Sequence, residues 1–390
     1  MSVWSTMFPV PLAWRQLVEH RARCAVAVLG VAFAVVLVLM QLGFSNALYA
    51  SAVRLHQSLA ADLVLISPQY SYLGLSKPFA RRRLDQTRSD PAVMAVTPLS
   101  FDMGAWKNPE TGATRNLLVI GVDPSASVLR LRGLTEQLPR IHRADVILFD
   151  AASRPEFGVQ AAALRSGGGL TAELGRRRVV VDGVFDLGTS FAVDGSTVTS
   201  ESTFLRLFPH RREGLIDIGL VRLHPGSRAD AVRARLTGTL PADVEVLTKA
   251  QFMTREQAYW RQNTPIGYVF TFGVIMGLAV GAVVVYLILF VNVTERLPEF
   301  ATLKAIGFAD AALFGIVGQQ ALLLAVAGFV PGALICCGLY RLTAHATRLP
   351  LELTPGTGIL VFALTLLMCG VSGVMALRKV RAADPAEVFA

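Results

Sequence analysis

The distribution of charged residues is the feature that most constrains this chain. Four long stretches contain no charged side chain: those between Arg23 and Arg54, Arg261 and Glu295, Asp310 and Arg341, and Glu352 and Arg378. A helix needs about 20 mostly apolar residues to cross a bilayer, and each stretch is long enough. The first stands alone and the other three lie together near the C-terminus. The sequence therefore predicts an α-helical membrane protein with four transmembrane helices, one plus three, and a large domain inserted between the first and second helices.

Basic residues at the ends of the spans predict their orientation. Arg15, Arg21 and Arg23 precede the first span and Arg378, Lys379 and Arg381 follow the last, so the positive-inside rule places both termini in the cytoplasm. Four crossings agree with that assignment and put the large insert outside. The predicted division is a cytoplasmic interfacial helix at 1–23, spans at 24–47, 264–293, 311–340 and 357–377, an outer α+β domain with stalk helices at 48–263, a cytoplasmic helix at 294–310, a short outer loop at 341–356 and a cytoplasmic tail at 378–390.

The insert has the pattern of a mixed α+β domain. Apolar residues at helical spacing follow the first span, and Lys249–Asn263, with aromatic residues among polar ones, leads into the second, which predicts two stalk helices. Between the stalks lie short β-rich runs at Asp62–Ser67, Val93–Phe101, Asn116–Val122, Val146–Phe149, Arg178–Phe185, Ile216–Leu223 and Val244–Leu247, and a helical pattern at Ala229–Leu236. All four cysteines lie in or beside spans, so this domain must be stabilised by its own core rather than by disulfides.

Composition and motifs argue against several classes of function. The formal charge of +9 is spread mostly over the insert without any nucleic-acid motif, so anionic lipid head groups are a better-matched partner than nucleic acid. There is no phosphate-binding loop, no nucleophile elbow and no zinc-protease motif, and the six histidines are scattered. We expect no cofactor and no catalytic site on this chain, so a membrane-anchored enzyme is the weakest reading; any ATP would be used by a partner subunit.

The most informative polar segment is the short cytoplasmic stretch Thr294–Phe308. Pro298 suits the first turn of a helix and Gly307 suits the position after its end. Phe300, Leu303 and Ile306 recur at three-residue spacing and would form one apolar face. The segment is either an interfacial turn or a helix that docks in a groove of a partner and passes its motion to the spans. The candidate contact residues are Arg296, Glu299, Phe300, Thr302, Leu303, Lys304, Ala305, Ile306 and Gly307.

This segment resembles a known family. Glu299–Gly307, with the sequence EFATLKAIG, looks like the corresponding segment of the MacB/FtsX-like ABC transporter permeases, and the one-plus-three span layout is similar to theirs. The resemblance is closer to the DevC-type permeases through Arg54–Leu59, Ala61–Pro68, Trp106–Gly112, Ala258–Trp260 and Thr264–Gly267. The Arg296-Leu297-Pro298 entry departs slightly from the His-Leu-Pro of that family.

The resemblance implies a homodimeric, non-catalytic permease in a bacterial inner membrane. It also implies that the outer side is the periplasm and that the helix at 294–310 is a coupling helix. The permease would work with a separate ABC ATPase subunit, a periplasmic membrane-fusion adaptor and often an outer-membrane tunnel protein. Such permeases act as mechanotransmitters that couple ATP hydrolysis to periplasmic movement and export, and the DevC resemblance suggests a lipophilic cargo such as a glycolipid. The alternative is an FtsX-like signalling scaffold that regulates an envelope hydrolase without transporting cargo.

One basic run remains open to two interpretations. Arg81, Arg82 and Arg83 are consecutive in the insert. They form either an ordinary solvated face or a contact with lipid phosphates or with an acidic patch of the adaptor.

Overall fold

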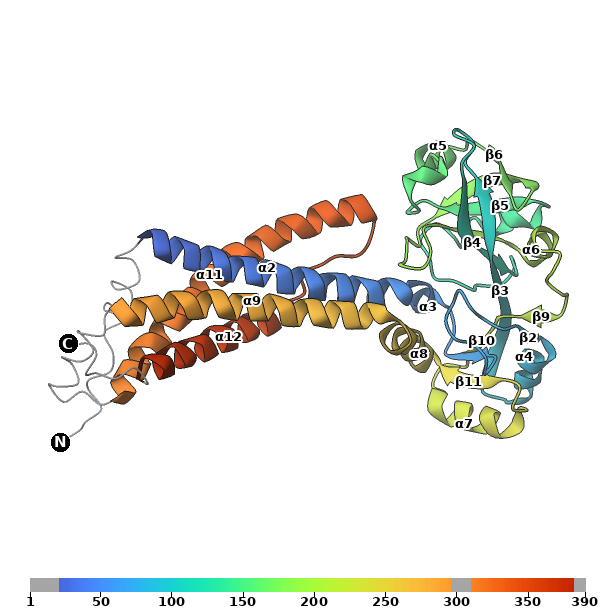
Figure 1. Cartoon of the computed structure of the whole chain (residues 1–390). Helices are drawn as coiled ribbons and strands as arrows, with labels where there is room; N and C mark the ends of the chain where they lie inside the picture. Colours follow the sequence, from blue (N-terminus) through green and yellow to red (C-terminus); the bar gives the residue numbers. More distant parts are fainter. Residues whose placement is uncertain (1–20, 296–309, 382–390) are drawn as a thin grey trace, which may run out of the picture. The chain divides into compact units, whose positions relative to one another are not determined.

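The computed structural model describes residues 21–295 and 310–381, and these fall into two compact units. The helical unit contains the long apolar helices. The sheet unit consists of residues 47–265 together with the short segment 345–350. Figure 1 follows the chain through both.

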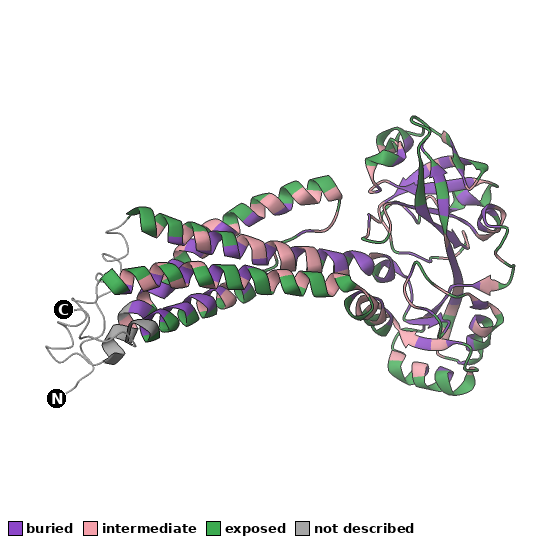
Figure 2. Cartoon of the chain, in the orientation of Figure 1, coloured by how far each residue is buried: buried purple, intermediate pink, exposed green. Residues whose placement is uncertain are grey.

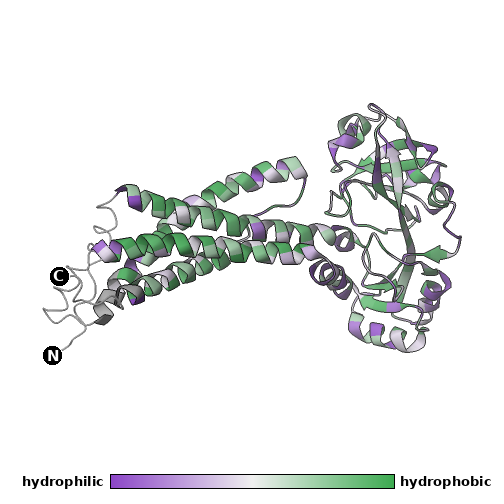
Figure 3. Ribbon diagram, viewed as in Figure 1, coloured by the Kyte–Doolittle hydropathy of each residue, from purple (hydrophilic) through white to green (hydrophobic). Residues whose placement is uncertain are grey.

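The helical unit is built from four helices within the described ranges, each long and apolar enough to cross a membrane. They are α2 (Arg21–Ala52), α9 (Pro265–Glu295), α11 (Asp310–Thr347) and α12 (Pro355–Arg381). Most residues along these helices are hydrophobic (Figure 3), and many large apolar side chains are exposed, among them Tyr268 at 72% and Ile359 at 70%. Apolar exposure of this extent suits contact with lipid rather than with water.

Glycines allow these helices to approach one another closely. A Cβ on Gly277 of α9 would lie 3.1 Å from Val38 Cγ2 on α2, and one on Gly281 would lie 2.6 Å from Ala34 Cβ. On α11, a Cβ on Gly332 would lie 2.8 Å from the carbonyl oxygen of Ala32. Small residues at such positions are what lets membrane helices pack, because lipid provides no hydrophobic force that drives helices together.

The sheet unit has a sheet of nine strands within the described residues, in the order β11-β1-β10-β3-β4-β8-β5-β7-β6. Their bounds are β1 (Leu63–Ile66), β3 (Val93–Lys107), β4 (Thr114–Val122), β5 (Val146–Asp150), β6 (Leu170–Leu174), β7 (Arg177–Phe185), β8 (Ser196–Ser200), β10 (Ile218–Leu223) and β11 (Glu245–Thr248). A small second pairing joins β2 (Phe79–Ala80) to β9 (Leu215–Ile216). An additional β3–β6 pairing closes β3, β4, β8, β5, β7 and β6 into a barrel, while β11, β1 and β10 continue the sheet outside the barrel from the first part of β3.

Short helices cover the sheet and connect its strands. They are α3 (Arg54–Ser58), α4 (Arg82–Gln86), α5 (Ala161–Arg165), α6 (Glu201–Leu207), α7 (Ala229–Thr239), α8 (Lys249–Gln262) and the 3₁₀ turns η1 (Thr87–Ser89), η2 (Leu138–His142) and η3 (Pro155–Phe157). The buried residues lie along the strands and on the inner faces of these helices, as Figure 2 shows. Trp106 anchors the barrel core, where it is fully buried and its Nε1–H donates to the carbonyl of Phe157 at 3.0 Å.

The fold class predicted from the sequence is confirmed, with a sheet-rich α+β domain between the first and second of the four helices. A strand lies within or overlaps each of the seven predicted β runs, and α7 covers the predicted helix at Ala229–Leu236. Two strands of the barrel, β6 and β8, were not predicted.

Candidate functional site

The chain passes between the long helices and the sheet unit through three segments. These are the end of α2 with α3, the helix α8 that precedes α9, and residues 345–350 between α11 and α12. The sheet unit includes the first two segments, from residue 47 onward and up to residue 265, and the third segment, residues 345–350. The side chains that hold these three segments in the sheet unit form the candidate functional site.

Helix α8 begins at a well-formed cap. Thr248 Oγ1 accepts a hydrogen bond from the Gln251 N–H at 3.2 Å, and the Thr248 N–H donates to Gln251 Oε1 at 3.0 Å. This reciprocal capping box fixes where the helix starts. From that start, Phe252, Glu256 and Trp260 recur every four residues and form the buried face of α8.

Glu256 is the centre of a buried polar cluster. Its carboxylate is 1% exposed and accepts hydrogen bonds from Tyr70 Oη at 2.9 Å, from the Leu73 N–H at 3.2 Å and from Trp260 Nε1 at 3.2 Å. A buried carboxylate is costly unless donors surround it, and these donors come from α8 and from the loop that follows β1. One side chain therefore holds that loop against the second stalk.

His56 brings the first stalk into the same cluster. It lies on α3, is 1% exposed, and its Nε2 is 3.4 Å from both Tyr70 Oη and Glu256 Oε2. Its ring packs on Phe252 with a centroid distance of 4.5 Å. Burial raises the pKa of Tyr70 well above its ordinary value, and the adjacent Glu256 carboxylate raises it further, so the phenol stays a hydrogen-bond donor. The two stalk helices are thus joined by packed rings and by a shared carboxylate.

A second group of contacts is formed by residues 187–194, which we call the strut loop. Asp150 at the end of β5 is fully buried and accepts from the N–H groups of Leu187 at 3.0 Å and Gly188 at 2.9 Å. Burial raises the pKa of Asp150, whereas these backbone hydrogen bonds act in the opposite direction. At the other end of the loop, Asp194 lies 2.9 Å from Arg154 Nε and 3.8 Å from Arg115 Nη1. Both ends of the strut loop are therefore fixed to the barrel.

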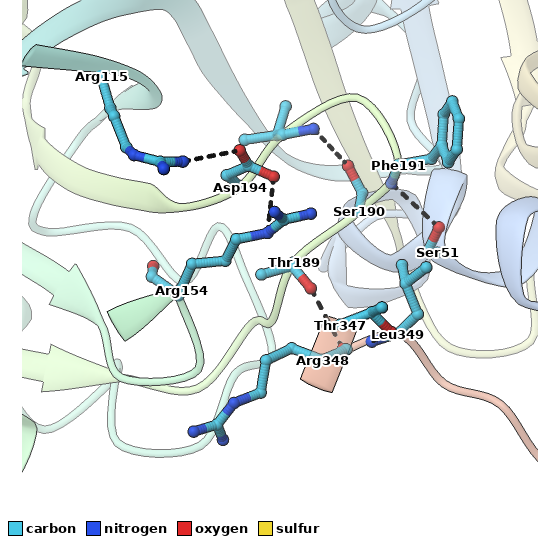
Figure 4. A network of polar contacts seen from close by, with 12 residues as sticks. Ser51, Arg115, Arg154, Thr189, Ser190, Phe191, Asp194, Thr347, Arg348 and Leu349 are labelled. Carbon is cyan, nitrogen blue, oxygen red and sulfur yellow. Dashed lines mark hydrogen bonds and ion pairs between the residues drawn. The ribbon is translucent and has the colours of Figure 1, made fainter. Parts of the chain in front are cut away.

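The middle of the strut loop contacts all three connecting segments, and Figure 4 shows the hydrogen bonds to two of them. The Phe191 N–H donates to Ser51 Oγ at 3.2 Å, and Thr189 Oγ1 donates to the carbonyl of Arg348 at 3.2 Å. The Phe191 ring also meets Trp260 of α8 edge-on, at a centroid distance of 6.1 Å.

Arg54 of α3 reinforces the same contact. Its Nη1 donates to the Thr189 carbonyl at 2.9 Å. Burial lowers the pKa of Arg54, and the nearby Asp150 opposes that shift. Gly188 has a φ of +93°, and a Cβ there would overlap the Arg54 guanidinium, so both the backbone conformation and the available space require glycine.

The residues predicted for ATPase coupling lie outside the described residues, and their role stays a prediction. They are Arg296, Glu299, Phe300, Thr302, Leu303, Lys304, Ala305, Ile306 and Gly307.

The structure describes the basic run Arg81–Arg83, and two of its members pair with different acidic residues. Arg81 pairs with Glu201 at 3.2 Å and Arg83 pairs with Asp243 at 2.9 Å, whereas Arg82 is exposed. Two of these three charges are balanced within the domain. In the part of the chain that the structure describes, no three His, Cys, Asp or Glu side chains are grouped as metal ligands.

Sequence reasoning missed both Glu256 and the strut loop. Glu256 lies among the polar residues of a predicted stalk, and only its spacing of four from Phe252 and Trp260 could have marked it as buried. The strut loop has no motif of its own. Its role depends on neighbours that are more than 100 residues away in sequence, such as Ser51 and Arg348.

Comparison with protein families gives two matches that together span most of the chain. Residues 24–239 match the MacB-like periplasmic core domain, and residues 271–385 match the FtsX-like permease C-terminal domain. The chain is 24% identical over 386 residues to an uncharacterized ABC transporter permease of Mycobacterium tuberculosis, with 96% of each chain covered. A second such permease of M. tuberculosis is 22% identical over 384 residues, with 97% of each chain covered.

Among solved structures, the chain is similar to the periplasmic region of MacB from Actinobacillus actinomycetemcomitans, with 12% identity, a TM-score of 0.37, and coverage of 53% of this chain and 96% of that one. It is also similar to the extracellular domain of the noncanonic ABC-type transporter YknZ from Gram-positive bacteria, with 13% identity, a TM-score of 0.34, and coverage of 48% and 99%. The periplasmic-domain match alone covers more than half of the chain. This chain belongs to the MacB/FtsX-like family of ABC transporter permeases, and its sheet unit is the periplasmic domain of that family.

Proposed function

We propose that this permease is the mechanotransmitting subunit of an ATP-driven export complex. Movement would begin at an ABC ATPase bound to the cytoplasmic segment, pass along the apolar helices and reach the periplasmic domain. The cargo would be lipophilic, such as a glycolipid. The complex would contain two copies of this chain in the inner membrane, with both termini cytoplasmic. It would also contain a periplasmic membrane-fusion adaptor and often an outer-membrane tunnel protein. Arg82 is the member of the basic run best placed for a lipid or adaptor contact.

The observation that supports this proposal most is the way in which the periplasmic domain is attached. The first stalk, the second stalk and the 345–350 segment all continue into apolar helices, and all three are held together by side chains inside the domain. A domain tethered by one flexible linker could not be driven by its helices, because a linker absorbs displacement. Stalks that share buried groups such as Glu256 favour transmission of movement as a unit.

The cytoplasmic segment provides the test. Leu303→Asp places a charge on the expected apolar docking face, so we expect it to abolish co-purification with the ABC ATPase. Lys304→Ala alters the polar face, and we expect the complex to assemble but to lose part of its stimulated ATP hydrolysis. Both variants would be purified from native membranes in mild detergent, with insertion checked by the yield of the tagged chain.

Mass spectrometry of the co-purifying proteins would separate the two functional classes. An ABC ATPase together with a periplasmic adaptor supports export. An ABC ATPase with a cell-wall hydrolase and no adaptor would replace export with a signalling scaffold. Normal stimulated ATP hydrolysis by the Leu303 variant would contradict the docking role of this segment.

A further inference from the structure

Two hydroxyl groups tie the strut loop to segments that continue into different apolar helices. Ser51 is the second-last residue of α2, and Arg348 directly follows α11. The bonds from the Phe191 N–H to Ser51 Oγ and from Thr189 Oγ1 to the Arg348 carbonyl are 3.2 Å each. Residues 345–350 pack with the periplasmic domain rather than with the helical unit. The strut loop therefore contacts the ends of α2 and α11 at the same place.

The two hydroxyl groups belong to buried residues, Ser51 and Thr189, whereas their partners Phe191 and Arg348 are exposed. Thr189 is 1% exposed and uses both its polar side-chain atom and its carbonyl, which accepts from Arg54 Nη1 at 2.9 Å. Arg348 has a φ of +59°, a conformation that non-glycine residues adopt at a cost of about 1 kcal/mol or more and keep only when their surroundings hold them. Its carbonyl is the acceptor for Thr189 Oγ1. The hydrogen bond from Thr189 therefore reaches a residue whose strained backbone conformation must be held by its surroundings, so we regard it as a specific contact.

Both ends of the strut loop are held against the barrel and resist displacement. Asp150, fully buried on β5, holds its first residues, and Arg154 holds Asp194 at its end. A segment fixed at both ends to a closed barrel transmits displacement instead of absorbing it, because packed interiors deform little.

We propose that Thr189 and Ser51 are positioning residues through which the strut loop couples the ends of α11 and α2 to the barrel of the periplasmic domain. This inference rests on the proposed mechanotransmission and names a route for it besides the two stalks. Movement of the α11–α12 connection would reach the barrel through Thr189, and movement of the end of α2 would reach it through Ser51.

The experiment uses the full chain in lipid nanodiscs with its co-purifying ABC ATPase. Amide hydrogen exchange of the barrel strands is compared between the nucleotide-free complex and the complex trapped with ATP and vanadate, at equal nucleotide occupancy. In the wild type we expect trapping to change the exchange of β5 and of residues 187–194. Thr189→Val keeps the shape of the side chain but removes the donor, and we expect it to reduce this difference by about fivefold, the equivalent of one lost hydrogen bond of about 1 kcal/mol.

Matched variants distinguish coupling from folding. Thr189→Ser restores the hydroxyl and should restore the nucleotide-dependent difference. Ser51→Ala should reduce it independently of Thr189. Thr237→Val and Ser89→Ala remove hydroxyls whose hydrogen bonds stay local, to Arg233 and Gln86, and should behave as the wild type.

Each outcome has one meaning. A full wild-type difference in both Thr189→Val and Ser51→Ala would overturn the inference while leaving mechanotransmission intact. A wild-type complex with no nucleotide-dependent difference anywhere in the periplasmic domain would overturn the proposed function and the inference with it. Loss in Thr189→Val that Thr189→Ser does not repair would show a packing role and also contradict the proposal.

Discussion

At the scale of single residues, a few buried polar groups join separate segments of the periplasmic domain, which contains no cysteine. Glu256 is the clearest case, because its carboxylate accepts from Tyr70, Leu73 and Trp260 and lies beside His56. The sequence predicts a stalk helix at this position but not the buried acid. A glutamate among polar neighbours is normally solvated, and only the folded arrangement shows that its partners come from other segments.

Glu256→Ala should strongly destabilise the periplasmic domain. It leaves the buried donors of Tyr70 and Trp260 without an acceptor, and we expect a loss of about 3 kcal/mol or more. Tyr70→Phe removes one donor together with its bond and should cost only about 1 kcal/mol. Thermal unfolding of the full chain in detergent measures both, with the exposed Glu136→Ala as the control. Equal losses in the Glu256 and Tyr70 variants would refute the central role of the carboxylate.

At the scale of elements, most strands were predicted from alternating apolar residues, whereas β6 and β8 were missed. Strand β8 was missed because its sequence, Ser-Thr-Val-Thr-Ser, reads as a polar turn, yet all five residues are buried. The hydroxyls of Ser196, Thr199 and Ser200 have hydrogen-bond partners, as when Thr199 Oγ1 donates to the Val146 carbonyl at 2.8 Å, whereas the buried Thr197 Oγ1 has none. Strand β6 directly follows the glycine triplet Gly167–Gly169, and such a triplet is typical of a loop rather than of the start of a strand.

Helix packing gives a prediction at the same scale. Gly332→Ala on α11 would place a methyl group 2.8 Å from the Ala32 carbonyl and 2.9 Å from Val35 Cβ, so α11 and α2 must separate, at a cost of about 2 kcal/mol. Gly338→Ala on the same helix meets no atom within 4 Å and should be neutral or slightly stabilising. The midpoint of thermal unfolding in detergent compares the two. A Gly332 variant as stable as the Gly338 variant would mean that the helices do not pack as described.

At the scale of the whole molecule, architecture was easier to predict than the site. Long uncharged stretches such as Arg261 to Glu295 specify spans by composition alone, because the bilayer excludes charge. The resemblance in Glu299–Gly307 led to the family that the comparisons show. The strut loop could not be predicted, because its role depends on tertiary contacts between residues that are far apart in the sequence.

The predicted orientation can be tested on the intact molecule. In a variant with Cys24, Cys336, Cys337 and Cys369 replaced by alanine, Arg177→Cys puts a thiol on an exposed position of the periplasmic domain. A membrane-impermeant maleimide should label it in intact spheroplasts. Glu299→Cys, in the expected cytoplasmic segment, should be labelled only after lysis. Labelling of Glu299→Cys in intact spheroplasts would reverse the topology.

Strand β3 gives the periplasmic domain a further property. Its first part pairs with β10 and its second part with β4, and Leu99 is paired on both sides, with Ile218 and with Val122. The barrel and the part of the sheet outside it therefore share one continuous strand, and no cut between them leaves either with its full set of strands. Neither half should survive as a separately expressed fragment, and recombination between relatives should exchange this domain whole or not at all.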